Sequence, residues 1–303
     1  MKCAVLGSDG FIGSHLTEAL LAKGYDVKCF DKTIRSKIPR IEKIEGNFLD
    51  EESLRQALRG CDTCFHLIST TLPSSSNESP IFDVQTNVIG TIRLLELCLE
   101  ENVQKVIFIS SGGTVYGMPL EIPIKESHPT NPICSYGITK LTCEKYLSLF
   151  HHLYGLEYRI LRVANAFGER QKTNSAQGAI AVFLAKALRD EEIEIWGDGS
   201  TVRDYIHVDD VIDAFLRVMA YEGEQKIFNI GSGNGRSLNE VLDTIEKVLA
   251  KRIKKIYTGK KRRLDVPINV LSIELAKREL MWSPKVEFDE GVERFAKWLK
   301  ERL

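Results

Sequence analysis

Tyr136 and Lys140 are the two side chains in this sequence whose types and spacing best suit proton transfer. Both lie near the start of residues 136–154, which we predict to form a long helix, and a separation of four residues places them on one face of it. An ammonium group beside a phenol stabilises the phenolate, so we expect a lowered pKa for Tyr136. A phenolate can remove the proton of a substrate hydroxyl group. The pattern YxxxK is common by chance, however, and gains meaning only from its context.

A glycine-rich turn, GxxGxxG at residues 7–13, supplies the first part of that context. It joins a predicted strand, residues 2–6, to a predicted helix, residues 11–22. Gly7 permits a tight turn, Gly10 lets a pyrophosphate approach the backbone, and Gly13 lets the helix pack closely on the strand. Amide groups at a helix N-terminus attract phosphate, so we predict a dinucleotide site here that includes Phe11 and Ile12.

Asp31 indicates which dinucleotide this site prefers. It ends the second predicted strand, residues 27–30. A carboxylate at this place accepts hydrogen bonds from the adenosine ribose and repels a 2′-phosphate, which favours NAD over NADP. Arg35 lies close by and could hold that phosphate, so NADP remains the alternative. With a nicotinamide present, Tyr136 can take a hydroxyl proton while the hydride leaves for the cofactor.

The elements that position these residues alternate between strand and helix. The strands are apolar throughout, which is typical of a parallel sheet covered by helices on both faces. We predict strands at 2–6, 27–30, 64–68, 105–109 and 158–163, and helices at 11–22, 51–58, 82–99 and 136–154. Farther along we predict helices at 176–188, 208–220, 238–249 and 289–299, and short strands at 193–196 and 226–230.

No linker divides the chain, so any second domain packs tightly on the first. We expect an α/β fold with a Rossmann-type parallel sheet and a smaller C-terminal α/β lobe. The predicted NAD-binding domain comprises residues 1–165 and 203–230, and the predicted substrate lobe comprises residues 166–202 and 231–303.

Composition excludes several other functions. The 303 residues include 41 Lys and Arg and 42 Asp and Glu, a balance that weighs against a nucleic-acid partner. No apolar run is long enough to span a membrane, and the N-terminus resembles a first strand and not a signal peptide. The seven scattered cysteines, including Cys61 and Cys64, are interpreted as reduced core residues of a cytoplasmic protein, and we expect no metal site.

Together with the segment SSGGTVYG at 110–117, these motifs resemble the extended short-chain dehydrogenase/reductase family. Within it, the sequence is similar to NAD-dependent nucleotide-sugar epimerases of the UDP-glucose 4-epimerase type, over nearly the whole chain. The resemblance implies that Tyr136 takes the 4-hydroxyl proton of a UDP-hexose while the C4 hydride passes to a permanently bound NAD. The 4-keto sugar then rotates about its diphosphate link, and the hydride returns to the opposite face of the sugar.

The resemblance also implies further cofactor contacts. Asn47 and Phe48 match the pair that meets adenine, although the family usually has Asp where Asn47 stands. The segment 66–69 resembles the strand end beneath the cofactor, and Asn87 resembles the residue that braces the strand at 105–109. The cofactor residues implied in this way are Asn47, Phe48, Leu67, Ser69, Asn87 and Ser110, with Tyr136 and Lys140.

The second half of the chain matches the family's substrate motifs. Asn165 and Arg203 match residues that bind the sugar diphosphate, and Arg262 aligns with a second arginine of this kind. Arginine suits a diphosphate because its planar fork forms paired hydrogen bonds. Trp196 falls where an aromatic residue packs on uracil, and Asn269 falls at the gatekeeper of the sugar pocket. Asn is smaller than the Tyr that excludes N-acetyl sugars there, so a plain and an N-acetylated hexose both remain open.

One position departs from the family pattern. A Ser or Thr usually donates a hydrogen bond to the reacting sugar oxygen, yet counting back from residues 114–117 gives Gly112. Counting back from Tyr136 gives Ser111, and Thr114 is a third candidate. We therefore expect Ser111, Thr114 or a water molecule to replace the missing donor. The segment also lacks the carboxylates that 4,6-dehydratases and decarboxylases of this family require.

The helices at 82–99 and 136–154 resemble those that pair across a two-fold axis in this family, which implies a homodimer. Their residues Leu94, Leu97, Leu149 and Leu153 either face outward or pack within one chain. Two other functions stay open at this point: a net ketoreductase that acts on a nucleotide sugar, and a catalytically silent NAD-binding protein.

Overall fold

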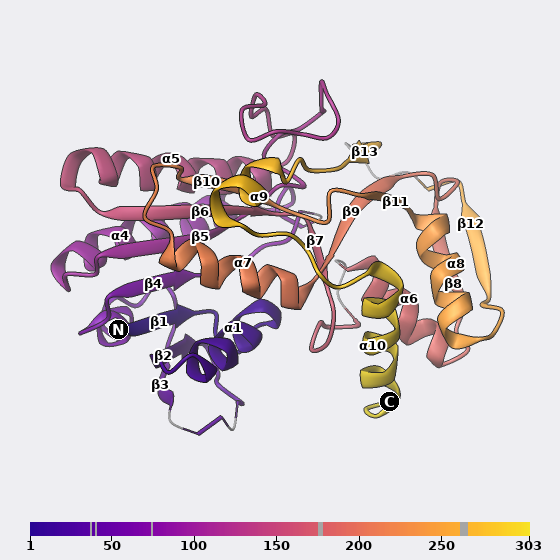
Figure 1. The fold of residues 1–303 in the computed structure, drawn as a ribbon, viewed down its shortest axis with the longest axis horizontal. Coiled ribbons are helices and arrows are strands. Elements are labelled where there is room, and N and C mark those ends of the chain that lie inside the picture. Colours follow the sequence, from indigo (N-terminus) through magenta and orange to yellow (C-terminus); the bar gives the residue numbers. More distant parts are fainter. Residues whose placement is uncertain (37, 40, 74, 175–177, 261–265) are drawn as a thin grey trace.

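A seven-stranded sheet forms the centre of the computed structural model, which describes residues 1–303 apart from 37, 40, 74, 175–177 and 261–265 (Figure 1). All its neighbouring strands are parallel, in the order β10-β6-β5-β4-β1-β2-β3. The strands are β1 (Lys2–Leu6), β2 (Asp26–Asp31), β3 (Ile41–Glu45), β4 (Thr63–His66), β5 (Lys105–Ser111), β6 (Glu157–Val163) and β10 (Ile227–Ile230). This arrangement confirms the expected Rossmann-type fold.

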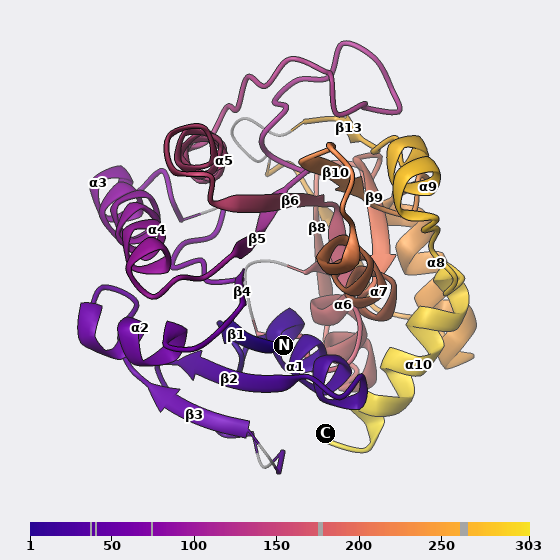
Figure 2. The same ribbon diagram turned by 60° about the vertical axis from the view of Figure 1, so that its left-hand side comes forward.

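Helices cover both faces of the sheet (Figure 2). One face packs against α1 (Phe11–Ala22), α7 (Val208–Ala220) and α9 (Glu274–Leu280) in one apolar core. The other face packs against α2 (Glu51–Leu58), α4 (Gly90–Glu100) and α5 (Ser135–Tyr154) in a second core. A short helix, α3 (Pro80–Asp83), and a π-helical segment, η1 (Val84–Ile89), lead into α4 without a break.

The C-terminal lobe lies beyond the carboxyl ends of the parallel strands (Figure 1). Its four-stranded sheet is centred on β9 (Val202–His207), with β7 (Asn165–Phe167), β11 (Gly235–Ser237) and β13 (Ile268–Asn269). A two-stranded sheet joins β8 (Ile193–Trp196) to β12 (Lys255–Thr258). A third apolar core lies beneath α6 (Ala179–Leu188), α8 (Leu238–Leu249) and α10 (Phe288–Lys300).

The structure differs from the sequence-based expectations in the lobe more than in the sheet. β9 belongs to the sheet of the lobe, so the chain returns to the parallel sheet at α7 and not at residue 203. α9, which the sequence analysis placed with the lobe, packs on β10 and α7. β3, β9 and α9 were not predicted as elements, because their sequences carry neither a continuous apolar run nor a long helical period.

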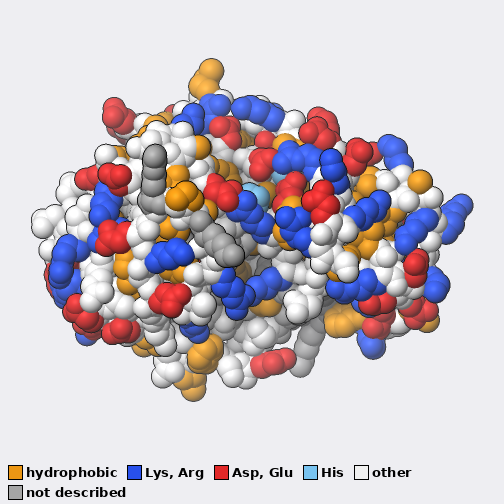
Figure 3. Space-filling view, turned by 90° about the horizontal axis from the view of Figure 1, so that it is seen from below, with side chains coloured by type: hydrophobic (Ala, Val, Ile, Leu, Met, Phe, Trp, Pro, Cys, Tyr) orange, Lys and Arg blue, Asp and Glu red, His pale blue; other side chains and the backbone are white. Residues whose placement is uncertain are grey.

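Acidic and basic side chains are interspersed on the face shown in Figure 3, in keeping with a formal net charge of −1. Among the described residues, no helix is both long and apolar enough to cross a membrane.

A buried ion pair links α5 to the central strands. The Arg162 guanidinium on β6 lies 2.6 Å from a carboxylate oxygen of Glu144 on α5, and both side chains are almost fully buried. Glu144 also accepts a hydrogen bond from Ser110 on β5, and Arg162 donates one to Tyr116. These contacts fix α5, the helix that carries Tyr136 and Lys140, against two strands of the sheet.

We expect Arg162→Met to lower the free energy of unfolding by about 3–5 kcal/mol, because Glu144 would keep a buried charge without a partner. Denaturant titration measures this change. The matched control is Arg93→Ala, which breaks the exposed pair with Glu96 and should change stability little. Equal effects of the two substitutions would contradict the structural role of the buried pair.

Candidate active site

The glycine-rich turn has the geometry that a bound pyrophosphate requires. Gly7 has a positive φ of 89° and donates its N–H to the Phe30 carbonyl at 2.8 Å. A Cβ on Gly13 would lie 2.0 Å from the Gly7 carbonyl oxygen, so no side chain fits there. Gly10 caps α1 in an extended conformation without a side-chain hydrogen bond, which leaves the helix N-terminus, with Phe11 and Ile12, open to an anion.

Asp31 lies at the carboxyl end of β2, next to this turn. Its Oδ2 accepts the backbone N–H of Asp9 at 3.0 Å, and its Oδ1 accepts that of Lys32 at 2.8 Å. The carboxylate is therefore held in place by backbone groups and keeps lone pairs for ribose hydroxyls. The backbone N–H of Arg35 binds Asp9, which places this residue in the same loop.

The expected adenine contacts lie on the next loop. Phe48 is buried with its ring 5.1 Å from that of His66, whereas Asn47 is exposed and accepts the Leu49 N–H through its Oδ1. Leu67 is partly buried and Ser69 exposed, just beyond β4. The free amide groups and the open space at the glycine turn, the carboxylate of Asp31 and this loop together fit a dinucleotide.

Asn87 differs from its expected role. Its side chain does not hydrogen-bond β5. It accepts the Thr70 N–H through Oδ1 at 3.1 Å and donates to Asp83 at 2.8 Å. Asn87 therefore fixes the loop after β4 against η1.

Lys140 is buried, and none of the acidic side chains that the structure describes forms an ion pair with it. Its Nζ donates to the Ile109 carbonyl at 2.9 Å and lies 4.6 Å from the Phe108 ring centroid. Burial lowers the pKa of Lys140 to about 8, and the Cys143, Glu144 and Asp83 charges oppose this shift. One carbonyl uses one of three N–H groups, so the ammonium can still donate to ribose hydroxyls.

The pKa of the Tyr136 phenol is raised, which contradicts the expectation that it is lowered. Burial raises the pKa of Tyr136 to about 12, and a hydrogen bond with Ser69 opposes this only in part. The Lys140 ammonium lies 5.7 Å from the phenol ring centroid and is bound to the Ile109 carbonyl, so it does not neutralise the phenol oxygen. Desolvation of the phenolate therefore outweighs the charge of Lys140 in the protein alone.

The missing hydroxyl at Gly112 has a steric explanation. A Cβ on Gly112 would lie 2.5 Å from Leu271 and 3.1 Å from the Arg162 carbonyl oxygen, so a side chain would point into the packed interior. Thr114 offers a hydroxyl instead: its Oγ1 is buried and has no partner among the described residues. The Thr114 carbonyl abuts Gly137 in the first turn of α5, beside Tyr136. Ser111 ends β5 and is partly buried.

Three of the predicted substrate residues lie on adjacent strands of the lobe. Asn165 on β7 donates to the Asp204 carbonyl at 3.1 Å, and Arg203 on β9 is in register with Asn269 on β13. Asn269 is fully buried and donates to the Gly112 carbonyl at 3.2 Å, and its Oδ1 has no hydrogen-bond partner in the described part of the chain.

Trp196, another predicted substrate residue, stands apart from this group. Trp196 ends β8, in the separate two-stranded sheet, and is 46% exposed. The Lys260 Nζ lies 6.0 Å from its ring centroid. Arg262 lies outside the described residues.

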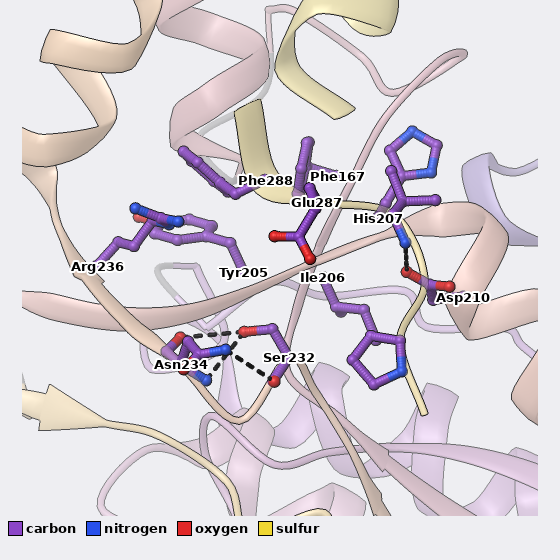
Figure 4. Close-up of a pocket in the computed structure, with 12 residues that line it drawn as sticks. Phe167, Tyr205, Ile206, His207, Asp210, Ser232, Asn234, Arg236, Glu287 and Phe288 are labelled. Carbon is purple, nitrogen blue, oxygen red and sulfur yellow. Dashed lines mark hydrogen bonds between the residues drawn. The ribbon is translucent and has the colours of Figure 1, made fainter. Parts of the chain in front are cut away.

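A separate pocket opens between β9, β11 and the start of α10 (Figure 4). The Arg236 guanidinium stacks 4.4 Å from the Phe288 ring there, and Tyr205 and His207 also line the pocket. Neither Tyr136 nor Lys140 lines it, so we place the chemistry at the edge of the parallel sheet. Among the described residues, no group of three or more His, Cys, Asp or Glu is arranged to hold a metal ion.

Sequence reasoning missed Ser76 and Asp83, which contact the first turn of α5. Ser76 accepts the backbone N–H of Tyr136 at 3.0 Å, and Asp83 accepts the hydroxyl of Ser135 at 2.6 Å. The one signal for Asp83 is a carboxylate on the inner face of a helical segment, and Ser76 lies in a serine-rich stretch without any pattern.

Known proteins are similar to this chain in both sequence and fold. The model of the NAD dependent epimerase/dehydratase family matches residues 3–231. The chain is 32% identical over 312 residues to the UDP-glucose 4-epimerase of Mycolicibacterium smegmatis, covering 100% of this chain and 99% of that protein.

Two solved structures extend this similarity. The UDP-glucose 4-epimerase of Thermotoga maritima with UDP-glucose matches with a TM-score of 0.94 and 35% identity, over 99% of each chain. The UDP-N-acetylglucosamine 4-epimerase of Methanobrevibacter ruminantium, in complex with UDP-N-acetylmuramic acid, matches with a TM-score of 0.92 and 29% identity, over 100% of this chain and 99% of that one. The chain thus belongs to the NAD-dependent epimerase/dehydratase family.

Proposed function

We propose that this protein catalyses the reversible C4 epimerisation of a UDP-hexose with NAD held as a bound cofactor. The observation that carries the proposal is the place of Tyr136 and Lys140. Lys140 binds β5 near its carboxyl end, and β5 lies in the sheet between β1, which leads into the glycine-rich turn, and β6, which leads into β7 with Asn165. The strand β9, which bears Arg203, pairs with β7. The similar epimerases of Thermotoga maritima and Mycolicibacterium smegmatis support the same reaction.

NAD supplies the hydride acceptor, and the chain's own residues bind it and move the proton. Gly7, Gly10 and the N-terminus of α1 hold the pyrophosphate, and Asp31 holds the adenosine ribose. Tyr136 accepts the proton of the sugar 4-hydroxyl and later returns it. Because burial raises the pKa of this phenol to about 12, the phenolate depends on the nearby Lys140 ammonium and the positive nicotinamide ring.

The substrate residues hold the nucleotide and leave the hexose free to turn. Asn165 and Arg203 bind the diphosphate, Trp196 packs on the uracil, and Arg262 supplies a second positive charge. Thr114 donates a hydrogen bond to the sugar oxygen. The hydride leaves C4 and returns to it, and the proton leaves the 4-hydroxyl oxygen and returns to it, so the reaction consumes no cofactor. This balance distinguishes an epimerase from a net ketoreductase.

We propose that the pocket accepts a plain hexose and its N-acetylated counterpart. Asn269 lies beside Gly112 and is small, and its partnerless Oδ1 can accept the N–H of an acetamido group. The similarity to the UDP-N-acetylglucosamine 4-epimerase supports this second substrate.

We further propose a cytoplasmic location and a homodimer. All seven cysteines are free thiols, which suits a reducing compartment. Leu94 and Leu97 are buried within the chain, so they do not form the dimer surface, whereas Leu149 and Leu153 are exposed. The exposed apolar residues on α3, η1 and α5 form an apolar surface that suits pairing with a second copy. They are Ile81, Phe82, Val84, Ile89, Ile138, Leu149, Leu153 and Tyr154.

Leu153→Glu should convert the dimer to a monomer, because it puts a charge into the paired apolar surface. Light scattering after size-exclusion chromatography measures the mass. The control is Leu120→Glu, at a leucine that is 82% exposed in the loop between β5 and α5 and should leave the dimer intact. A wild-type protein that is monomeric at micromolar concentration would refute the dimer.

Tyr136→Phe should slow epimerisation about 10²–10⁴-fold, because it removes the group that transfers the proton. Proton NMR of UDP-galactose and of UDP-N-acetylgalactosamine, incubated without added cofactor, follows the gluco-configured products. NAD released on denaturation serves as the control and should be as abundant in the variant as in the wild type. Residual activity within tenfold of wild type would rule out Tyr136 as the catalytic base.

Thr114→Val should lower kcat about 10²–10³-fold, because the hydroxyl that donates to the sugar oxygen is lost while the side-chain shape is kept. Ser111→Ala is the comparison and should lower kcat less than about tenfold. The opposite order would assign the donor to Ser111, and two unaffected variants would favour a water molecule.

A further inference from the structure

The loop after β4 and α3 hold the first turn of the catalytic helix. The Ser135 N–H donates to Asn77 Oδ1 at 2.8 Å, and the Tyr136 N–H donates to Ser76 Oγ at 3.0 Å. The Ser135 hydroxyl donates to Asp83 Oδ2 at 2.6 Å. The free amide groups at the start of α5 are thus satisfied by side chains from another part of the chain.

Asp83 is a fully buried carboxylate surrounded by neutral donors. Its Oδ1 accepts from Thr71 at 2.6 Å and from Asn87 at 2.8 Å, and Thr139 Oγ1 lies 3.3 Å from its Oδ2. Within the described part of the chain, no Lys, Arg or His forms an ion pair with it. A buried charge of this kind is costly unless hydrogen bonds and a nearby positive potential offset it.

Lys140 presents the opposite charge in the same interior. Its Nζ is bound to a carbonyl, and the other carboxylate on its helix face, Glu144, already pairs with Arg162. A small cavity is lined by Lys140 together with Asn87 and Thr139, two of the donors to Asp83. Asp83 is therefore the carboxylate available to offset the Lys140 charge. The positive N-terminal end of α5, which Asp83 contacts through Ser135, in turn stabilises the charge of Asp83.

The other titratable groups around this pair are neutral or already paired. Burial lowers the pKa of His66 to about 3, and burial raises the pKa of the Cys134 and Cys143 thiols. Near neutral pH, the charges that face Lys140 are thus Asp83 and the Glu144–Arg162 pair.

We propose that Asp83 is a positioning residue for the Tyr136–Lys140 pair. Asp83 fixes the first turn of α5 through Ser135 and Thr139, and it balances the charge of the Lys140 ammonium. The inference rests on the proposed function for its kinetic test only. It assigns a role to a residue that touches neither sugar nor cofactor.

The charge of Asp83 raises the pKa of Lys140 and also that of Tyr136. Asp83→Asn keeps the shape and an acceptor oxygen and removes the charge, so both pKa values should fall. The reaction needs a phenolate and an ammonium. Both limbs of the rate profile should therefore move to lower pH, because the phenolate forms at lower pH and the ammonium is lost at lower pH.

The test compares kcat as a function of pH for the wild type, Asp83→Asn and Ser135→Ala, each with its own bound cofactor. We expect Asp83→Asn to shift both limbs to lower pH by about half a unit or more, with KM changed less than about threefold. Ser135→Ala removes one donor to Asp83 and keeps the charge, so its kcat should fall while its profile stays in place. Equal losses with no shift in either variant would reduce Asp83 to a structural role and overturn the proposal.

A second measurement needs no substrate. Carbon-13 NMR of lysines labelled at Cε follows the titration of Lys140, whose resonance is identified by its absence in Lys140→Arg. The midpoint should be lower in Asp83→Asn than in the wild type, and an unchanged midpoint would overturn the inference.

If Asp83→Asn does not fold, Asp83→Glu is the second variant. It keeps the charge, so it should fold and show the wild-type titration midpoint of Lys140. An inactive wild type with a shifted Lys140 midpoint would refute the proposed function alone.

Discussion

The burial of one ammonium group, that of Lys140, constrains the rest of the site. An unpaired cation is tolerated in a protein interior only where fixed dipoles and charges surround it. Here the Ile109 carbonyl at the end of β5 binds it directly, and the carboxylate of Asp83 lies near the start of the same helix. These groups work only if α5 keeps its register against the sheet, which the buried Glu144–Arg162 pair secures from the other side.

The same constraint explains why the protein alone does not activate its base. The interior that holds Lys140 also surrounds the Tyr136 phenol and makes the phenolate costly. A proton acceptor of this kind becomes effective when positive charge is brought beside it. Catalysis would thereby depend on the bound cofactor, which the glycine turn and Asp31 would hold.

The sequence was sufficient for features that depend on local sterics, and less so for those that depend on distant contacts. Gly13 is recognisable because any side chain there would collide with the Gly7 carbonyl at the start of the turn. Asp31 is recognisable because it ends an apolar strand. Asp83 and Ser76 meet the catalytic helix across more than 50 residues of chain, so no spacing reveals them. The phenol pKa was predicted with the wrong sign, because desolvation depends on packing that a sequence does not show. Helical periodicity likewise identifies apolar faces without saying what covers them, which is why Leu94 and Leu149 could not be told apart.

An epimerase of this kind moves a hydride from C4 to the bound cofactor and returns it to the same carbon. The most informative measurement uses UDP-galactose that carries deuterium at C4, incubated with the purified protein and no added cofactor. NMR and mass spectrometry should find UDP-glucose that retains the deuterium at C4. Loss of deuterium to solvent, or conversion only when external NAD or NADH is supplied, would show that the hydride does not follow this path.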